Sequence, residues 1–343
     1  MRVLVAMSGG VDSSVAAALL VEQGHEVVGA TMKLWGGPSD SGCCSVADVD
    51  DARRVAQQLG IVHHVFNFGE EFEARVVEPY VTAHANGRTP NPCVECNRHL
   101  KFDRLLRRAR QLGFDAMATG HHARVVRHGG RWQLWRGVDG AKDQSYVLSM
   151  LGQQQLERIV LPVGELTKTE VREKAAALAL RTAVKPDSQD VCFITATGGR
   201  RAFLGERIGL RPGRLVDSST CDDVGRVAAV ELVTVGQRRG LGQGLGGSRR
   251  YALSVDVDSA TVVVGSLDDL AAEEVAMTGM CWVDEPVEAG SEVEVQTSAH
   301  GRPQPAVLVG DAVRYHEAQR RVAPGQTVVL YRGDRVLGGG IAA

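Results

Sequence analysis

The sequence lacks several features that would assign it to a class at once. It has no run of about 18 consecutive apolar residues, which a membrane-spanning helix needs. Its net charge of -2 is far from the basic balance of many nucleic-acid-binding domains, so any RNA contact must come from local patches. The first residues run into an apolar strand pattern and show no secretion signal. We therefore expect a soluble cytoplasmic protein without membrane contact.

Internal repeats and low-complexity tracts are also missing. The 343 residues are enough for two or three domains, each with its own core, and 44% hydrophobic and 23% charged residues are typical of globular proteins. The seven cysteines are odd in number and irregularly spaced, which argues against a disulfide framework. They are Cys43, Cys44, Cys93, Cys96, Cys192, Cys221 and Cys281. In a reducing compartment, the close Cys93-x-x-Cys96 pair indicates metal binding or sulfur chemistry.

The first part of the chain alternates β-rich and helical segments, a pattern typical of βαβ units on a parallel sheet. Strands are predicted at Val3 to Met7, Glu26 to Leu34, Ile61 to Phe68 and Phe114 to Thr119. Helices are predicted at Ser14 to Glu22, Val46 to Leu59, His99 to Leu112 and, after the capping box at Thr167 to Glu170, Val171 to Leu180. Gly60 and Gly113 end two of these helices. The pattern predicts a doubly wound α/β domain over residues 1–195.

After Arg211-Pro-Gly213 the glycine content rises and helical periodicity fades. The runs Val230 to Val235 and Tyr251 to Val257 predict a small β-rich central domain over residues 196–270. From residue 271 to 343, β-rich runs separated by turn residues predict a terminal antiparallel β-barrel. These runs are Val275 to Val283, Glu292 to Thr297, Pro305 to Val309 and Thr327 to Tyr331.

The strongest local signal is Ser8-Gly-Gly-Val-Asp-Ser-Ser14, which lies directly between an apolar strand and an apolar helix. Its glycines allow backbone N–H groups to surround a phosphate, and the helix presents its positive end to an anion. Asp12 is a candidate for positioning Mg²⁺. The loop has neither the lysine of G-x-x-x-x-G-K-[ST] nor the spacing of G-x-G-x-x-G, which disfavours γ-phosphoryl transfer and dinucleotide binding. It resembles the PP-loop of ATP pyrophosphatases, which leave AMP on a substrate oxygen.

A second signal is the proline-rich loop Arg88-Thr-Pro-Asn-Pro-Cys-Val-Glu-Cys-Asn97, which carries two cysteines. A structural zinc site would need four ligands, and even with His99, Cys43 and Cys44 the spacing matches no common zinc module. A passive buried thiol pair fits poorly with flanking prolines. Catalytic chemistry at the cysteines is the favoured interpretation, and the zinc site and the passive pair stay open as alternatives.

With these residues together, the chain resembles the tRNA-specific 2-thiouridylases, the bacterial MnmA family. The resemblance covers nearly the whole length and rests on an ordered set of motifs. Besides the nucleotide loop they are Gly87 to Pro92 with Cys96-Asn97, Ala118 to His121, Lys142 to Tyr146, Pro162 to Glu165, Asp187-Ser188 with Cys192-Phe193, Gly236 to Gly242, Pro324 to Gln326 and Leu337 to Gly340.

This resemblance implies three domains and a two-step reaction on the wobble uridine of certain tRNAs. ATP adenylates the oxygen at C2 of the base, and a cysteine persulfide then delivers sulfur to that carbon. By position, Cys96 resembles the family's nucleophile and Cys192 the residue that carries the persulfide, which would leave a Cys96–Cys192 disulfide. Arg98, His99 and Lys101 are nearby cations that favour a thiolate. A sulfur carrier protein would donate the persulfide, and the chain is expected to act as a monomer.

The resemblance also assigns the binding residues. ATP is expected at Ala6, Met7, Ser8, Gly9, Gly10, Val11, Asp12, Ser13, Met32 and Gly120. The tRNA is expected at Asn91, Pro92, Cys93, His121, Lys142, Asp143, Gln144 and Gln326.

One position departs from the family pattern, because many members carry aspartate where this chain has Cys93. Cys93, Cys96 and Cys192 are therefore also candidate ligands of a [4Fe-4S] cluster with one iron left open for sulfide. The persulfide relay and the cluster mechanism both remain open at this stage.

Basic side chains supply the candidate RNA patches. They are Lys101, Arg104, Arg107, Arg108 and Arg110 on the helix from His99, and arginine pairs at 200–201, 238–239, 249–250 and 320–321. Such clusters follow phosphates, although a solvated basic face has the same sequence pattern. Two rival functions are a PP-loop enzyme that adenylates a small molecule and a non-catalytic tRNA-binding protein. A small-molecule enzyme would give the cysteines no role, and a non-catalytic tRNA-binding protein would give the nucleotide loop no role.

Overall fold

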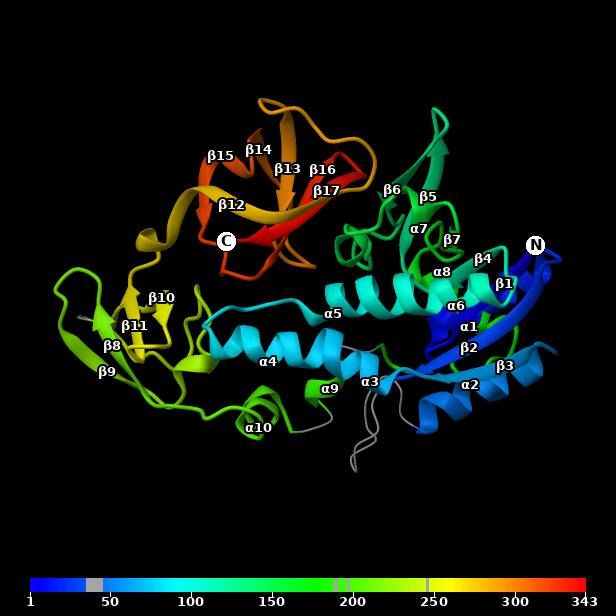
Figure 1. Ribbon diagram of the computed structural model, residues 1–343, viewed down its shortest axis with the longest axis horizontal. Helices are drawn as coiled ribbons and strands as arrows, with labels where there is room; N and C mark the ends of the chain where they lie inside the picture. The colour runs from blue at the N-terminus through cyan, green and yellow to red at the C-terminus, as the bar shows by residue number, and fades with distance from the viewer. Residues whose placement is uncertain (35–45, 188–190, 196–197, 245–246) are drawn as a thin grey trace.

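The computed structural model describes residues 1–34, 46–187, 191–195, 198–244 and 247–343, and within them the strands form three sheets (Figure 1). The first is a parallel sheet of five strands in the order β3-β2-β1-β4-β7. Its strands are β1 (Arg2–Ala6), β2 (Glu26–Lys33), β3 (Val62–Asn67), β4 (Ala116–Thr119) and β7 (Ile159–Val160). In β1, Val3 and Val5 join one hydrophobic core and Leu4 joins the other, since successive side chains point to opposite faces.

Helices cover both faces of this sheet, which confirms the doubly wound α/β fold. The core with Val3 is completed by α1 (Val11–Glu22), α2 (Val46–Gln58) and α8 (Lys168–Ala177). The core with Leu4 is completed by helices α3 (Gly69–Phe72), η1 (Glu73–Val77), α4 (Glu78–Ala85), α5 (Pro92–Glu95), η2 (Cys96–Leu105) and α6 (Leu106–Gln111). Shorter helices in this part are η3 (Ser145–Leu148), α7 (Gln153–Leu156) and α9 (Cys192–Thr195).

The predicted ends of the two helices that precede Gly60 and Gly113 agree with the structure. Gly60 and Gly113 have φ of +69° and +76°, the left-handed conformation that favours glycine after a helix. The sequence did not predict the helical run from Gly69 to Ala85 or the two-residue strand β7. It also missed that η2 is a π-helix over ten residues, a rare form that occurs at functional sites.

The central part contains helix α10 (Arg200–Gly205) and a sheet in the order β10-β11-β8-β9 around a small core of its own. The strands are β8 (Gly213–Asp217), β9 (Asp223–Val227), β10 (Tyr251–Asp256) and β11 (Thr261–Gly265). The strand predicted at Val230 to Val235 is wrong, because η4 (Val230–Leu232) is a short 3₁₀ turn. Its Glu231 is buried and forms an ion pair with Arg211, so this run contacts a neighbouring segment instead of pairing in a sheet.

The C-terminal part is a closed antiparallel barrel of six strands, as predicted, because β12 pairs with both β15 and β17. After the short turn η6 (Asp268–Leu270), its strands are β12 (Ala271–Trp282), β13 (Glu292–Gln296), β14 (Gln304–Val309), β15 (Ala312–Arg320), β16 (Thr327–Arg332) and β17 (Arg335–Ala342). Strands β15 and β17 were not predicted.

A hairpin from the first half of the chain extends this barrel sheet. Strands β5 (Ala123–His128) and β6 (Arg131–Arg136) pair with each other, and β6 pairs with β17 through Arg335 and Val336. The sequence did not predict this hairpin. The domain limits at residues 195 and 270 stay a prediction. None of the helices in the described residues is long and apolar enough to span a bilayer.

Candidate active site

The nucleotide loop follows β1 and leads into α1, as its sequence predicts. Gly9 has φ of +73°, and Gly10 precedes the helix without a side-chain cap bond from the described residues. The first backbone N–H groups of α1 are thus left for an anion at the positive helix end. Ser13 stiffens the loop, because its hydroxyl accepts the Ser8 N–H at 3.2 Å and donates to the Gly10 carbonyl at 3.1 Å.

The other predicted ATP residues lie at the same edge of the sheet. Ala6 and Met7 end or follow β1, and Met32 lies near the end of β2. Gly120 follows β4 and packs directly on the loop, since a Cβ atom there would lie 2.5 Å from the Ser13 backbone nitrogen. The carboxyl ends of parallel strands form the usual ligand site of α/β sheets.

Asp12 is the centre of an ion-pair cluster that was not expected. The ammonium of Lys168 donates to both Asp12 carboxylate oxygens at 2.7 and 2.8 Å, and His122 Nε2 lies 3.1 Å from Oδ1. Burial raises the pKa of Asp12, but the hydrogen bonds from His122 and Lys168 outweigh it and the net pKa is lowered.

Lys168 also joins this loop to a second carboxylate, because its ammonium lies 2.9 Å from Asp187 Oδ1. Asp187 accepts further bonds from Lys142 at 2.7 Å and Arg172 at 2.8 Å. Burial raises the pKa of Asp187, but the hydrogen bonds from Lys142 and Lys168 lower it to about 2. The carboxylate therefore stays ionised at neutral pH.

Lys185 holds the loop from another side. Its ammonium donates to the Gly9 carbonyl at 2.9 Å and to Asp48 and Asp51 on α2 at 2.6 and 2.8 Å. No pattern in the sequence pointed to Lys168, Lys185 or His122 as site residues. The capping box at Thr167 already placed Lys168 at the start of a helix, but only the fold shows which end of α1 it reaches.

The two predicted catalytic cysteines pack against one hydrophobic core. Cys96 begins η2 and Cys192 begins α9, and both are partly buried against the core that contains Phe193. Phe193 anchors the second cysteine segment, with its ring 5.6 Å from those of Phe72 and Tyr80. Cys93 is exposed, and its backbone N–H is accepted by the Asn91 side chain at 3.1 Å. Cys43, Cys44 and Ser188 lie outside the described residues.

The cations expected near the thiols have partners. Arg98 and His99 both face Glu95, at 3.7 and 3.1 Å. Lys101 reaches His121, whose Nε2 lies 3.5 Å from the ammonium, and His121 Nδ1 lies 2.7 Å from the Thr119 hydroxyl. Burial holds the pKa of His121 well below its usual value, and Lys101 adds to the effect.

Several of the predicted tRNA residues come together although they are far apart in sequence. The Asn91 side chain lies near the Tyr146 hydroxyl, which donates to the Thr327 carbonyl at 2.7 Å. The Thr89 N–H donates to the Pro324 carbonyl at 2.7 Å, so the turn with Gln326 lies against the loop of Asn91 and the buried Pro92.

The predicted tRNA residues between 142 and 144 differ in exposure. Gln144 is exposed, and its side chain accepts the His122 N–H. Asp143 is buried, accepts the Gly137 and Ser145 N–H groups and pairs with Arg136 at 3.0 Å. Asp143 thus has the contacts of a residue that shapes the loop.

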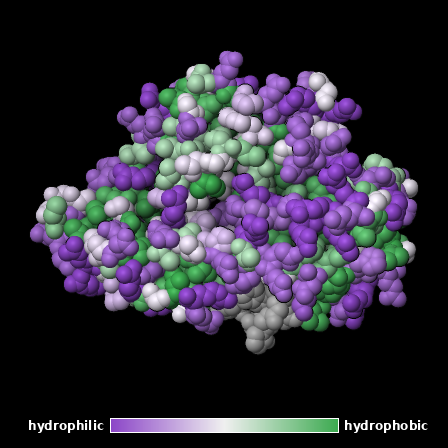
Figure 2. Space-filling view, viewed as in Figure 1, coloured by the Kyte–Doolittle hydropathy of each residue, from purple (hydrophilic) through white to green (hydrophobic). Residues whose placement is uncertain are grey.

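The basic helix expected to follow phosphates is exposed along η2 and α6, where Figure 2 shows hydrophilic side chains gathered. Arg104 pairs with Glu71 and Arg107 pairs with Asp103. Arg104 and Arg108 also lie over the rings of Phe68 and Phe66. Part of this basic face therefore stabilises the fold as well as adding positive charge to the surface.

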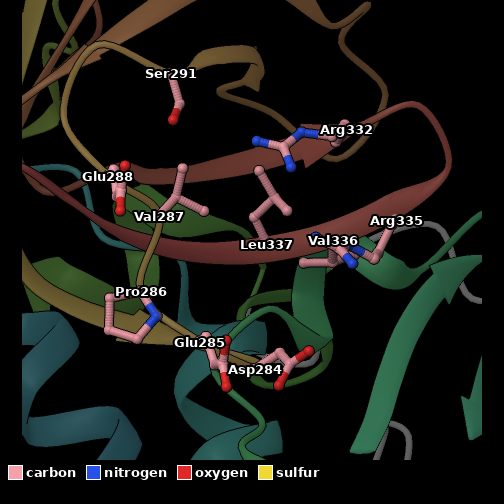
Figure 3. A pocket seen from close by; sticks show the side chains of 10 residues that line it. All are labelled: Asp284, Glu285, Pro286, Val287, Glu288, Ser291, Arg332, Arg335, Val336 and Leu337. Carbon is pink, nitrogen blue, oxygen red and sulfur yellow. The ribbon is translucent and has the colours of Figure 1, made fainter. Parts of the chain in front are cut away.

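A pocket of about 290 Å³ lies in the C-terminal barrel, and no residue of the nucleotide loop lines it (Figure 3). The loop after β12 and the β16–β17 hairpin form it, with Leu337 between Val287 and Arg332. Its Asp284 is paired with Arg131 of β6. No residue predicted for catalysis lines it, so we place the candidate chemistry at the sheet edge.

Comparison with known proteins gives one family over the whole chain. Residues 1–196 match the model of the tRNA methyl transferase HUP domain, 201–266 its PRC-barrel domain, and 272–342 the aminomethyltransferase beta-barrel domain. The tRNA-specific 2-thiouridylase MnmA of Chloroflexus aggregans is 49% identical over 99% of this chain and 97% of its own length. The chain belongs to the MnmA family. A second MnmA, from Mycolicibacterium paratuberculosis, is 48% identical over 98% of each chain.

Among solved structures, the U34-tRNA thiolase NcsA from Methanococcus maripaludis with its [4Fe-4S] cluster is similar in part. It is 17% identical, covers 60% of this MnmA-family chain and 62% of its own, and has a TM-score of 0.38. That likeness is too low to transfer the cluster.

The Mg²⁺ expected at Asp12 and the expected iron–sulfur cluster both stay predictions. The described residues, which include Cys93, Cys96 and Cys192, contain no group of three His, Cys, Asp or Glu side chains placed to hold a metal ion. Lys168 occupies both oxygens of Asp12, where Mg²⁺ was expected. We therefore derive no step through an iron–sulfur cluster or through Mg²⁺.

Proposed function

We propose that this protein is an ATP-dependent tRNA sulfurtransferase that converts the wobble uridine to 2-thiouridine. The observation that carries the proposal is the packing of Cys96 and Cys192, from distant segments, against one core on the sheet that also carries the nucleotide loop. Membership of the MnmA family supports the tRNA substrate. A small-molecule adenylating enzyme would leave both thiols unused.

The first step uses the nucleotide loop. The C2 oxygen of uridine attacks the α-phosphorus of ATP, the bond to the β-phosphate oxygen breaks, and pyrophosphate leaves. The free N–H groups at the start of α1 are placed to stabilise negative charge on the phosphates. The product is an adenylated base, from which the C2 oxygen can later leave as part of AMP.

The second step uses the cysteines. The terminal sulfur of a Cys192 persulfide attacks C2, and the C2–O bond breaks with release of AMP. The Cys96 thiolate then attacks the inner sulfur of Cys192, which breaks the sulfur–sulfur bond and leaves sulfur on the base. The transferred sulfur gains two electrons and the two thiols lose two, so a thiol reductant must open the resulting disulfide. A persulfide-carrying donor protein then reloads Cys192.

Cys96, which the family resemblance assigns as the attacking thiolate, lies near the start of a helical run. The helical run α5-η2-α6 begins at Pro92, with Asn91 as its N-cap, and places Cys96 in its first turns. The positive end of a helix stabilises an anionic sulfur mainly in the first turn, which contains Cys93, whereas Cys96 is the fifth residue of the run. The exposed Cys93 lies one turn earlier and has no step in this scheme.

The test is nucleoside mass spectrometry of unmodified tRNA incubated with enzyme, ATP, magnesium and a persulfide donor. The parent protein should form 2-thiouridine, and Cys96→Ala and Cys192→Ala should not. Cys281→Ala is the matched control, since Cys281 lies in the barrel strand β12. Cleavage of ATP to AMP without any tRNA thiolation, but with a small-molecule acceptor, would contradict the proposal.

A further inference from the structure

The nucleotide loop has no lysine in its own sequence, yet a lysine from a distant helix lies beside it. Lys168 is the first residue of α8, which packs against α1 in the same core. The Thr167 capping box fixes this helix start, because Thr167 accepts the Glu170 N–H and the Glu170 carboxylate accepts the Thr167 N–H. The Lys168 backbone N–H is accepted by Asp139 at 2.9 Å. These contacts fix the backbone at Lys168 and therefore the point from which its side chain extends.

The ammonium of Lys168 lies at the phosphate-binding end of α1. Its partner Asp12 is in the first turn of that helix, next to the uncapped N–H groups. The Lys168 side chain is only 11% exposed, so its charge is weakly screened by water. A phosphate at the start of α1 would therefore lie close to a desolvated cation.

Lys168 is also the exchangeable member of its cluster. Its ammonium donates two hydrogen bonds to Asp12 and forms an ion pair with Asp187. If Lys168 turned towards a phosphate, Asp187 would keep Lys142 and Arg172, and Asp12 would keep His122. Neither carboxylate would be left buried without a partner, which is the main cost of breaking a buried ion pair.

We infer that Lys168 is the phosphate-binding cation of this site, taking the place that a lysine inside the loop has in other nucleotide-binding loops. It donates from its ammonium to the α- or β-phosphate oxygens of ATP and stabilises the charge that develops on the departing pyrophosphate. The inference rests on the proposed use of ATP and adds a binding and catalytic residue to it.

The experiment is calorimetric titration of the full-length protein with ATP and, separately, with adenosine. For Lys168→Met we expect ATP affinity to fall about tenfold to a hundredfold, the usual value of a charge-assisted hydrogen bond, with adenosine affinity unchanged. General damage to the fold would weaken the binding of ATP and of adenosine alike. Lys174→Met, on the same helix but away from Asp12 and Asp187, is the matched control and should bind ATP like the parent.

The Asp187→Asn variant distinguishes phosphate binding by Lys168 from a purely structural role of Lys168 as a bridge between Asp12 and Asp187. This change removes a carboxylate that competes for Lys168, so ATP should bind at least as tightly as to the parent. Equal weakening of ATP binding by Lys168→Met and Asp187→Asn would overturn the inference, and so would normal ATP binding by Lys168→Met. Those outcomes leave the proposed function intact, whereas a parent protein that binds no ATP would contradict both.

Discussion

Gly120 lies so close to Ser13 that a Cβ atom on Gly120 would stand 2.5 Å from the Ser13 backbone nitrogen. The contact joins the end of β4 to the nucleotide loop, backbone against backbone. Because neither partner is the end of a flexible side chain, a methyl group cannot be accommodated without moving the loop.

Gly120→Ala should therefore displace the nucleotide loop and lower ATP affinity at least tenfold, measured by calorimetry. Gly209→Ala is the control, since a Cβ atom there would meet no atom within 4 Å. ATP binding by Gly120→Ala equal to that of the parent would show that the loop position does not depend on this contact.

His84 should make stability depend on pH. It is 2% exposed, contacts the Tyr80 ring edge-to-face and hydrogen-bonds with the Glu231 carbonyl of η4, and burial lowers its pKa to about 4. The unfolded chain binds the proton more tightly than the folded one, so stability is complete above about pH 6.5 and falls towards pH 4. At pH 5 the loss should be about 2 kcal/mol.

Urea unfolding at pH 7.5 and pH 5 measures this loss, and His84→Gln is the comparison. The substitution removes the titrating ring, so the difference in unfolding free energy between the two pH values should shrink by most of that amount. An unchanged difference in the variant would assign the pH dependence to other groups.

Asp187 should also lose its contribution to stability as pH falls, but at a lower pH than His84. Its pKa of about 2 is below the ordinary 3.8, so the contribution is present above about pH 4 and lost as pH falls through the folded pKa. Urea unfolding of the parent and Asp187→Asn should differ by on the order of 1–2 kcal/mol at pH 7. The difference should decrease below pH 4, and a difference that is constant down to pH 3 would contradict the ion-pair origin.

Cys93 should be dispensable if sulfur travels as a persulfide. It is exposed and has no step in the proposed scheme, so Cys93→Ser purified without oxygen should keep thiolation within about threefold of the parent, a small change in barrier. The measurement is 2-thiouridine yield together with iron content and the visible spectrum. Bound iron that disappears, together with activity, in Cys93→Ser would favour the cluster mechanism.

The sequence predicted the parts of the fold and site that depend on neighbouring residues. The nucleotide loop is a local pattern of glycine and serine between a strand and a helix, and Gly60 and Gly113 end helices by their own conformation. The missed site residues act across the chain. Lys168 reaches Asp12, and Lys185 reaches Gly9, only because the fold places these segments side by side.

The missed strands have physical reasons as well. Strand β17 contains three glycines in a row, which have poor strand propensity. The structure requires residues without a side chain here, since a Cβ atom on Gly338 would lie 2.4 Å from the Cys281 carbonyl oxygen. In β15, buried Val313 and Tyr315 alternate with exposed polar residues, a signal that was present in the sequence.

The most direct test of the central claim is to follow the sulfur atom. Enzyme carrying a heavy-isotope persulfide on Cys192 is mixed with ATP and unmodified tRNA for one turnover, without other sulfur donors. Transfer from a Cys192 persulfide predicts 2-thiouridine that is heavier by the isotope difference, one AMP per thiolated base, and a Cys96–Cys192 disulfide in the spent enzyme. Thiolated tRNA with the light isotope, or thiolation by Cys192→Ala, would contradict it.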